Sequence, residues 1–187
     1  MSVVSGLDLS GDRYTIKQKL IRSRYTVYDQ QGNAQLKAKK KRFKLKEEFP
    51  FKTPDGEPVF TIKAGGVFDV AGDYTITDAQ TGEEVAVLDK NFTFFQHSWK
   101  VRAPDGRVLA NIEGQGALLE AARHHVPLMG FLPHEYTIES PDGKSMGTIK
   151  GQFSLRDQYE VEITDSGSAP KEALVIAGIA IDALEGN

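Results

Sequence analysis

Near its C-terminus the chain reads Ala173-Leu174-Val175-Ile176-Ala177-Gly178-Ile179-Ala180-Ile181, followed by Asp182-Ala183-Leu184. Residues 173–181 are apolar on every face of a helix, which indicates burial on all sides. At ~1.5–3 kcal/mol for each large aliphatic side chain fully buried, the Leu, Val and Ile residues contribute on the order of 10 kcal/mol. That is comparable to the net stability of a whole domain. The rest of the fold must therefore enclose this helix.

The chain before this helix contains a block of about fifty residues that occurs nearly three times. We place the internal repeats at about 25–73, 74–122 and 136–184, beginning at Tyr25, Tyr74 and Tyr136. Each copy opens on an alternating segment, passes a Gly-containing turn and resumes alternation, which is typical of a β-hairpin. A second and longer strand is expected next, for example Phe92 to Ala103, before another turn and a last strand.

Four strands in each copy, one fewer in the third and one added over residues 14–19, predict about twelve strands. Repeats of this length also occur in propellers, but three blades are too few to close around a channel, and a propeller has no place for an apolar helix. A closed barrel removes the sheet edges and leaves an interior to be filled. The sequence therefore predicts a mainly β fold, a closed antiparallel barrel around the hydrophobic C-terminal helix. A single domain over residues 1–187 is expected, with one additional short helix over Ala117 to His125.

Several of these motifs together resemble a known family. They are the N-terminal Tyr14-Thr15-Ile16-Lys17-Gln18-Lys19-Leu20, the repeated Tyr-Thr-Val and Tyr-Thr-Ile hairpins, and the Asp-Gly turns, over roughly Tyr14 to Leu184. In these the chain is similar to the LURP-one-related family of the Tubby C-terminal-like superfamily, which also includes phospholipid scramblases. The resemblance implies the same barrel around a core helix. Through the Tubby and scramblase relatives it implies binding of membrane lipid or phosphoinositide, and it transfers no catalytic motif.

Charge is distributed unevenly along a chain whose formal net charge is −3. Residues 13–63 hold 14 Lys and Arg against 5 Asp and Glu, whereas residues 64–187 hold 9 against 19. A basic first third on a mildly acidic protein indicates one face that could meet an anionic partner.

The basic residues are densest in a ten-residue segment. We take as candidate lipid-binding residues Lys37, Lys39, Lys40, Lys41, Arg42, Lys44 and Lys46. Alternation with Phe43 and Leu45 predicts that Arg42, Lys44 and Lys46 share one outward strand face, which could grip a phosphorylated headgroup or a nucleic-acid backbone. The alternative is a solvated surface or an edge strand, where Lys discourages strand pairing. Few aromatic residues lie among the lysines, so nucleic acid is an unlikely partner.

Signals for catalysis and metal binding are weak. Gly143-Lys144-Ser145 resembles the end of a phosphate-binding loop, but Ile138 stands where that motif needs a Gly, and the segment is a hairpin turn. His124 and Glu120 have the spacing of a shared metal site, without a second ligand pair. The chain has no Cys, which excludes thiolate chemistry and disulfides. We expect no enzyme activity, no cofactor and no metal.

The leading hypothesis is a non-enzymatic binding protein whose basic strand engages an anionic membrane surface or a phosphoinositide headgroup. The alternative is a protein-interaction or scaffold module with an unknown partner and no lipid binding. Residues Met1 to Asp12 show neither a basic nor an apolar leader, so the expected location is the cytoplasm, peripheral at the membrane if lipid is bound.

Overall fold

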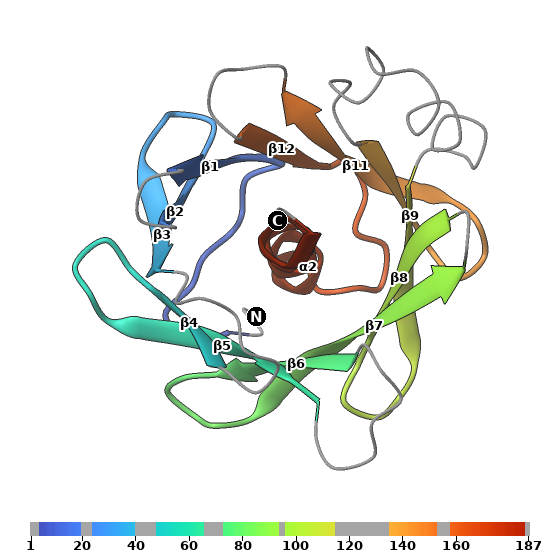
Figure 1. The fold of residues 1–187 in the computed structure, drawn as a ribbon, viewed down its shortest axis with the longest axis horizontal. Helices are drawn as coiled ribbons and strands as arrows, with labels where there is room; N and C mark the ends of the chain where they lie inside the picture. The colour runs from blue at the N-terminus through green and yellow to red at the C-terminus, as the bar shows by residue number, and fades with distance from the viewer. Residues whose placement is uncertain are drawn as a thin grey trace.

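The computed structural model describes residues 4–19, 24–39, 48–65, 73–93, 96–114, 135–152 and 158–185. These residues form one ring of strands around one helix (Figure 1). The helix, α2, spans Lys171–Glu185. The strands are β1 Arg13–Lys19, β2 Arg24–Tyr28, β3 Ala34–Lys39, β4 Glu48–Lys52, β5 Pro58–Ala64, β6 Asp73–Asp78, β7 Glu84–Thr93, β8 Gln96–Arg102, β9 Val108–Gly114, β10 Glu135–Glu139, β11 Ser145–Gln152 and β12 Gln158–Ile163.

Each strand pairs with its neighbours in sequence, and the ring closes where β1 pairs antiparallel with β12. All the ladders between neighbouring strands are antiparallel, the arrangement that tight turns such as those after β2 and β8 permit. The predicted closed antiparallel barrel of about twelve strands is confirmed. One expected strand was misplaced: Phe92 and Thr93 belong to β7, and they pair with His97 and Gln96 of β8 across a hairpin.

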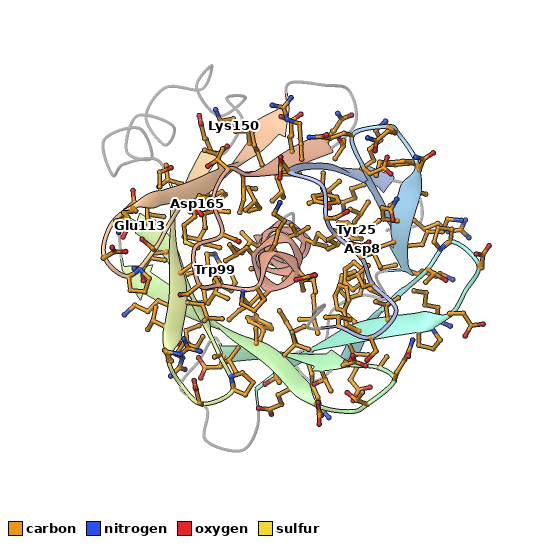
Figure 2. All side chains as sticks on the ribbon, turned by 180° about the vertical axis from the view of Figure 1, so that it is seen from behind. Asp8, Tyr25, Trp99, Glu113, Lys150 and Asp165 are labelled. Carbon is orange, nitrogen blue, oxygen red and sulfur yellow. The ribbon has the colours of Figure 1, made fainter. Side chains whose placement is uncertain are left out.

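Side chains alternate between the barrel interior and its outer wall. In β4 the two phenylalanines, Phe49 and Phe51, are buried while their neighbours are exposed, the period-two pattern of a half-buried strand. Figure 2 shows Tyr25 and Trp99 inside the ring, on either side of α2, with Lys150 on the outer wall. The core therefore lies between the strands and the helix.

The helix α2 fills the barrel, as the apolar run predicts. From Ala173 to Ile181 the apolar side chains of α2 are at most 1% exposed. Gly178 permits a close approach to the wall, because a Cβ at that position would lie 2.8 Å from Cγ2 of Val161 on β12. Among the described residues, no helix is both long enough and apolar enough to cross a bilayer.

Residues 4–12 form a strap across one mouth of the barrel. The strap runs from β12, where the amide of Ile163 donates to the carbonyl of Asp12, to the end of β6, where the carboxylate of Asp78 accepts from the amide of Ser5. β12 and β6 are six strands apart in a ring of twelve, so the strap spans the mouth. It buries Val4, Leu7 and Leu9 over the interior.

The strand connections at the strap end are tight turns with recurring backbone geometry. In the turns after β2, β4, β8 and β10 a glycine has positive φ and donates to a carbonyl three residues earlier, as at Gly32 and Gly106. Whether the three sequence copies superpose stays a prediction. The helix expected over Ala117 to His125 lies outside the described residues.

Candidate functional site

A row of basic side chains crosses the outer wall over the first four strands. Lys17 of β1 is opposite Thr26 of β2, Thr26 is opposite Lys37 of β3, and Lys37 is opposite Lys52 of β4. All three lysines are exposed. Because neighbouring strands lie ~4.8 Å apart, the row spans roughly 14 Å of the wall. Three of its four positions carry a positive charge.

A second pair of cations lies next to this row. Arg24 of β2 is directly opposite Lys39 of β3, and both side chains are exposed. We call Lys17, Arg24, Lys37, Lys39 and Lys52 the basic wall. Strand pairing brings these five residues together from four strands, although residues 17 and 52 are far apart in the chain.

No described carboxylate forms an ion pair with the basic wall. The ammonium group of Lys17 lies 4.9 Å from the ring centroid of Tyr28, and that of Lys37 donates to the carbonyl of Pro54 at 3.2 Å. A ring face and a neutral carbonyl hold an ammonium group without cancelling its charge. The five charges are therefore available to an anionic ligand.

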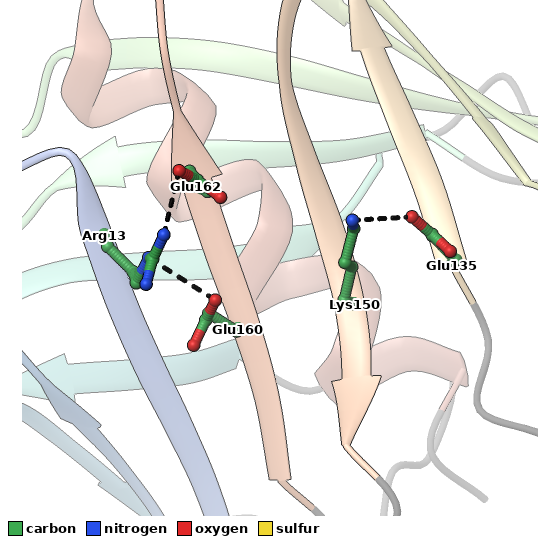
Figure 3. A network of polar contacts seen from close by, with 5 residues as sticks. All are labelled: Arg13, Glu135, Lys150, Glu160 and Glu162. Carbon is green, nitrogen blue, oxygen red and sulfur yellow. Dashed lines mark hydrogen bonds and ion pairs between the residues drawn. The ribbon is translucent and has the colours of Figure 1, made fainter.

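On the outer wall formed by β10, β11, β12 and β1, by contrast, charged side chains of opposite sign lie next to one another (Figure 3). Lys150 is opposite both Glu135 and Glu160, and it forms an ion pair with Glu135 at 3.0 Å. Arg13 contacts Glu160 at 3.4 Å and Glu162 at 3.0 Å. Opposed charges of opposite sign stabilise a sheet, and opposed like charges destabilise it. The basic wall thus departs from the pattern next to it.

A groove of about 1040 Å³ lies over the basic wall, lined by residues of β2, β3 and β4 and of the turn after β4. Four of the five cations line it, together with the aromatic or apolar residues Tyr25, Tyr28, Ala34, Ala38, Phe49 and Pro50. Tyr25 and Phe49 belong to the barrel core, where they are 1% and 3% exposed, so the accessible apolar lining comes from Tyr28, Ala34 and Pro50. Glu48 also lines the groove, and its carboxylate is paired with Lys63 at 3.1 Å.

Of the seven candidate residues predicted from sequence, Lys37 and Lys39 are exposed on the outer wall of β3. The other five, Lys40, Lys41, Arg42, Lys44 and Lys46, lie outside the described residues. Sequence reasoning missed Lys17, Arg24 and Lys52. The signal that could have found them is the period-two alternation of their strands combined with the hairpin register.

The other motifs from the sequence have structural roles. Gly143 has φ of 81° in the turn between β10 and β11, where Lys144 pairs with Asp142 at 2.8 Å. This is the predicted hairpin turn. Glu135 pairs with Lys150, and His124 and Glu120 lie outside the described residues. Within the part of the chain that the structure describes, no three His, Asp or Glu side chains are grouped to hold a metal ion.

Comparison with known proteins adds a family and a fold. A family model described as LURP-one-related matches residues 12–181. An X-ray structure of a protein from Arabidopsis thaliana superposes with a TM-score of 0.54, covering 94% of this chain and 91% of that one at 12% sequence identity. At that identity the likeness concerns the fold alone. No curated protein matches the sequence.

Proposed function

The chain belongs to the LURP-one-related family. We propose that it is a non-enzymatic protein whose basic wall binds the anionic surface of a membrane. The expected ligands are phosphatidylserine and phosphoinositide headgroups. Binding through the outer wall needs no change in the barrel itself.

One observation carries the proposal: the basic wall keeps charges that cost stability. Lys37 and Lys52 are directly opposite each other on neighbouring strands, and no described carboxylate compensates either one. Like charges in opposed positions destabilise a sheet by a few tenths of a kcal/mol to about 1 kcal/mol. Natural proteins break local pairing rules of this kind at functional sites and offset the cost elsewhere in the fold. Binding to an anionic partner is such a need.

The alternative of an edge strand does not account for Lys37. Lysine discourages pairing at an exposed sheet edge, but Lys37 pairs with Thr26 of β2 on one side and with Lys52 of β4 on the other. A solubilising surface also fails to account for the contrast with the wall of alternating charges at Glu135 and Lys150. An acidic protein partner is the remaining alternative, and vesicle binding distinguishes it.

The interior of the barrel supports a binding role over a catalytic one. Enzyme active sites are concave and open to substrate, whereas the residues of α2 from Ala173 to Ile181 fill the centre of this barrel. The groove over the basic wall contributes cations and aromatic rings, with its lining carboxylate Glu48 held by Lys63. These groups can bind an anion, and they offer no paired acid and base for proton transfer.

The electrostatics predict reversible, peripheral binding. A Lys or Arg close to an anionic leaflet contributes ~1 kcal/mol, within a Debye length of ~8 Å at physiological salt. Five such residues contribute at most about 5 kcal/mol, because a curved wall cannot place all of them equally close to a flat membrane. Binding should therefore weaken as salt is raised.

Sedimentation with vesicles tests the proposal. The protein is mixed at low salt with vesicles of phosphatidylcholine alone, of phosphatidylcholine with phosphatidylserine, and of phosphatidylcholine with a phosphoinositide. We expect sedimentation with the two anionic preparations and not with the neutral one. Absence of sedimentation with every vesicle, or equal sedimentation with neutral and anionic vesicles, would contradict the proposal and favour a protein partner.

A further inference from the structure

The groove over the basic wall is lined by apolar as well as charged residues, from β2, β3 and β4. We propose that this groove seats one anionic phospholipid molecule, with its phosphate among the cations and the adjoining part of its acyl chains along β3 and β4. This inference rests on the proposed function and goes beyond it. A membrane surface could be bound by charge alone, whereas a seated lipid requires the groove.

The boundary between β3 and β4 is where the barrel wall is most loosely paired. In the described residues these strands share two pairs, Lys37 with Lys52 and Ala38 with Phe51. Continuing that register would place Lys39 opposite Pro50, but these two residues do not pair. Pro50 has no N–H to donate to a ladder, and proline is tolerated in sheets mainly at edges and bulges. The described ladder between β3 and β4 ends at Ala38 and Phe51, and the next residues, Lys39 and Pro50, both line the groove.

The lining of the groove has the two components that an amphiphile needs. Arg24, Lys39 and Lys52 provide cations for a phosphate, and Lys37 adds a fourth beside Pro54. The apolar lining residues that are half-buried or exposed are Tyr28, Ala34, Pro50 and Pro54. A nucleic acid or a free inositol phosphate would use the cations and leave this apolar surface exposed to water, which forgoes the gain from burying it.

The size of the groove also favours more than a headgroup. Sites for drug-sized ligands occupy roughly 300–1,000 Å³, and this groove is at the upper limit at about 1040 Å³. A phosphate with a small polar substituent would fill only part of that space. Thr26 of β2 lines the groove, is half-buried and lies between Lys17 and Lys37 in the cross-strand row.

The test compares three soluble compounds by calorimetric titration of the full chain. Dihexanoyl phosphatidic acid, below its critical micelle concentration, has both a phosphate and acyl chains. Glycerol 3-phosphate has the phosphate without the chains, and dihexanoyl phosphatidylcholine has the chains without net charge. We expect phosphatidic acid to bind at least tenfold more tightly than either of the others, since only it satisfies both components.

A variant that fills the groove separates this inference from the proposed function. Thr26→Trp keeps every cation and a high strand propensity, and it adds bulk at a residue that lines the groove. We expect it to lose dihexanoyl phosphatidic acid binding by at least tenfold while it still sediments with phosphatidylserine vesicles. Circular dichroism and the thermal transition verify that the variant is folded. Should it fail to fold, the three-compound comparison on the wild type decides the question alone.

Two results would overturn the seated lipid. Equal affinity for phosphatidic acid and glycerol 3-phosphate would show that the acyl chains make no contact with the groove. Equal affinity for phosphatidic acid and phosphatidylcholine would show that the groove does not recognise the negative charge. If vesicles still sediment in either case, the membrane-binding proposal stands without a lipid seat. If anionic vesicles also fail to sediment, both proposals fail.

Discussion

Lys37 of β3 lies directly opposite Lys52 of β4 on the outer wall of the barrel, and no described carboxylate forms an ion pair with either side chain. A few strands away, Lys150 is opposite glutamates on both sides. The same barrel therefore contains one wall where charges are matched and one where they are not. This contrast can be measured as stability and as binding.

The first prediction concerns stability. Lys52→Glu should stabilise the protein by a few tenths of a kcal/mol to about 1 kcal/mol, because it replaces a repulsion with Lys37 by an attraction. The same substitution at Lys150 should destabilise by a similar amount, because it places a third carboxylate between Glu135 and Glu160. Urea denaturation of both variants measures the difference. Equal effects of the two substitutions would mean that cross-strand charge does not govern this wall.

A second prediction concerns the strap at residues 4–12. Asp78 is 2% exposed, and its carboxylate accepts from the amide of Ser5 at 2.6 Å, of Gln80 at 2.7 Å and of Thr81 at 3.0 Å. Burial acts to raise the pKa of Asp78, but the hydrogen bonds from these amides outweigh it and lower the pKa below its ordinary value. Asp78→Asn should cost about 1–3 kcal/mol of unfolding free energy at pH 7.

The stabilisation from the Asp78 carboxylate should depend on pH. A depressed carboxyl pKa stabilises the fold above the unfolded-state pKa, and the contribution is lost as pH falls through the folded-state pKa. The difference in unfolding free energy between the wild type and Asp78→Asn should therefore shrink as the pH is lowered below the pKa of an ordinary aspartate. Asp55→Asn, in an exposed turn, is the control and should change stability by less than about 0.5 kcal/mol at any pH. A pH-independent difference at Asp78 would contradict the ionised-carboxylate account.

A third prediction tests the packing of the central helix. A methyl group at Gly178 would lie 2.8 Å from Cγ2 and 3.3 Å from Cγ1 of Val161. Gly178→Ala should destabilise by about 1–3 kcal/mol despite the better helix propensity of alanine, because a close-packed core does not accept an added carbon. In a Val161→Ala background the same substitution should cost less. Additive effects in the double-mutant cycle would show that helix and wall are not in contact at this point.

A fourth prediction concerns alkaline conditions. Tyr14 is buried, and burial raises the pKa of its phenol to about 12. Between the ordinary tyrosine pKa of ~10 and about 12, the unfolded chain loses this proton while the folded chain retains it. Stability should therefore fall as the pH rises through that interval. Tyr14→Phe should remove that part of the decline, which denaturation at pH 9 and pH 11 detects. An identical decline in the variant would mean that other groups cause it.

The fold could be predicted from sequence because two independent patterns agree. The alternating segments specify strands, and the apolar residues from Ala173 to Ile181 need an enclosure on all sides, which the closed barrel provides. The misplaced strand at Phe92 to Ala103 has a physical reason. No Gly or Pro stands between Phe92 and Trp99, so the hairpin between β7 and β8 leaves no turn signal in the sequence.

The candidate site could be predicted only in part. A run of basic residues is visible along the chain, and it indicated Lys37 and Lys39. The register of three separate strand pairs decides whether the basic wall includes Lys17, Arg24 and Lys52. A shift of one residue would turn each of these side chains to the other face of the sheet. Sequence alternation alone does not specify that register. The strap was missed as well, because Val4, Leu7 and Leu9 follow no strand or helix period.

Two triple variants with the same change in net charge test whether the basic wall is the membrane-binding surface. One neutralises the basic wall, with Lys37, Lys39 and Lys52 changed to Gln. The other changes Lys100, Lys144 and Lys150 to Gln, on β8, the β10–β11 turn and β11. The measurement is sedimentation with vesicles that contain phosphatidylserine, at low salt. We predict that the first variant binds roughly a hundredfold more weakly than the wild type, at ~1 kcal/mol for each lost cation, and that the second binds almost normally. Equal binding by the two variants would show that the basic wall is not the membrane-binding surface.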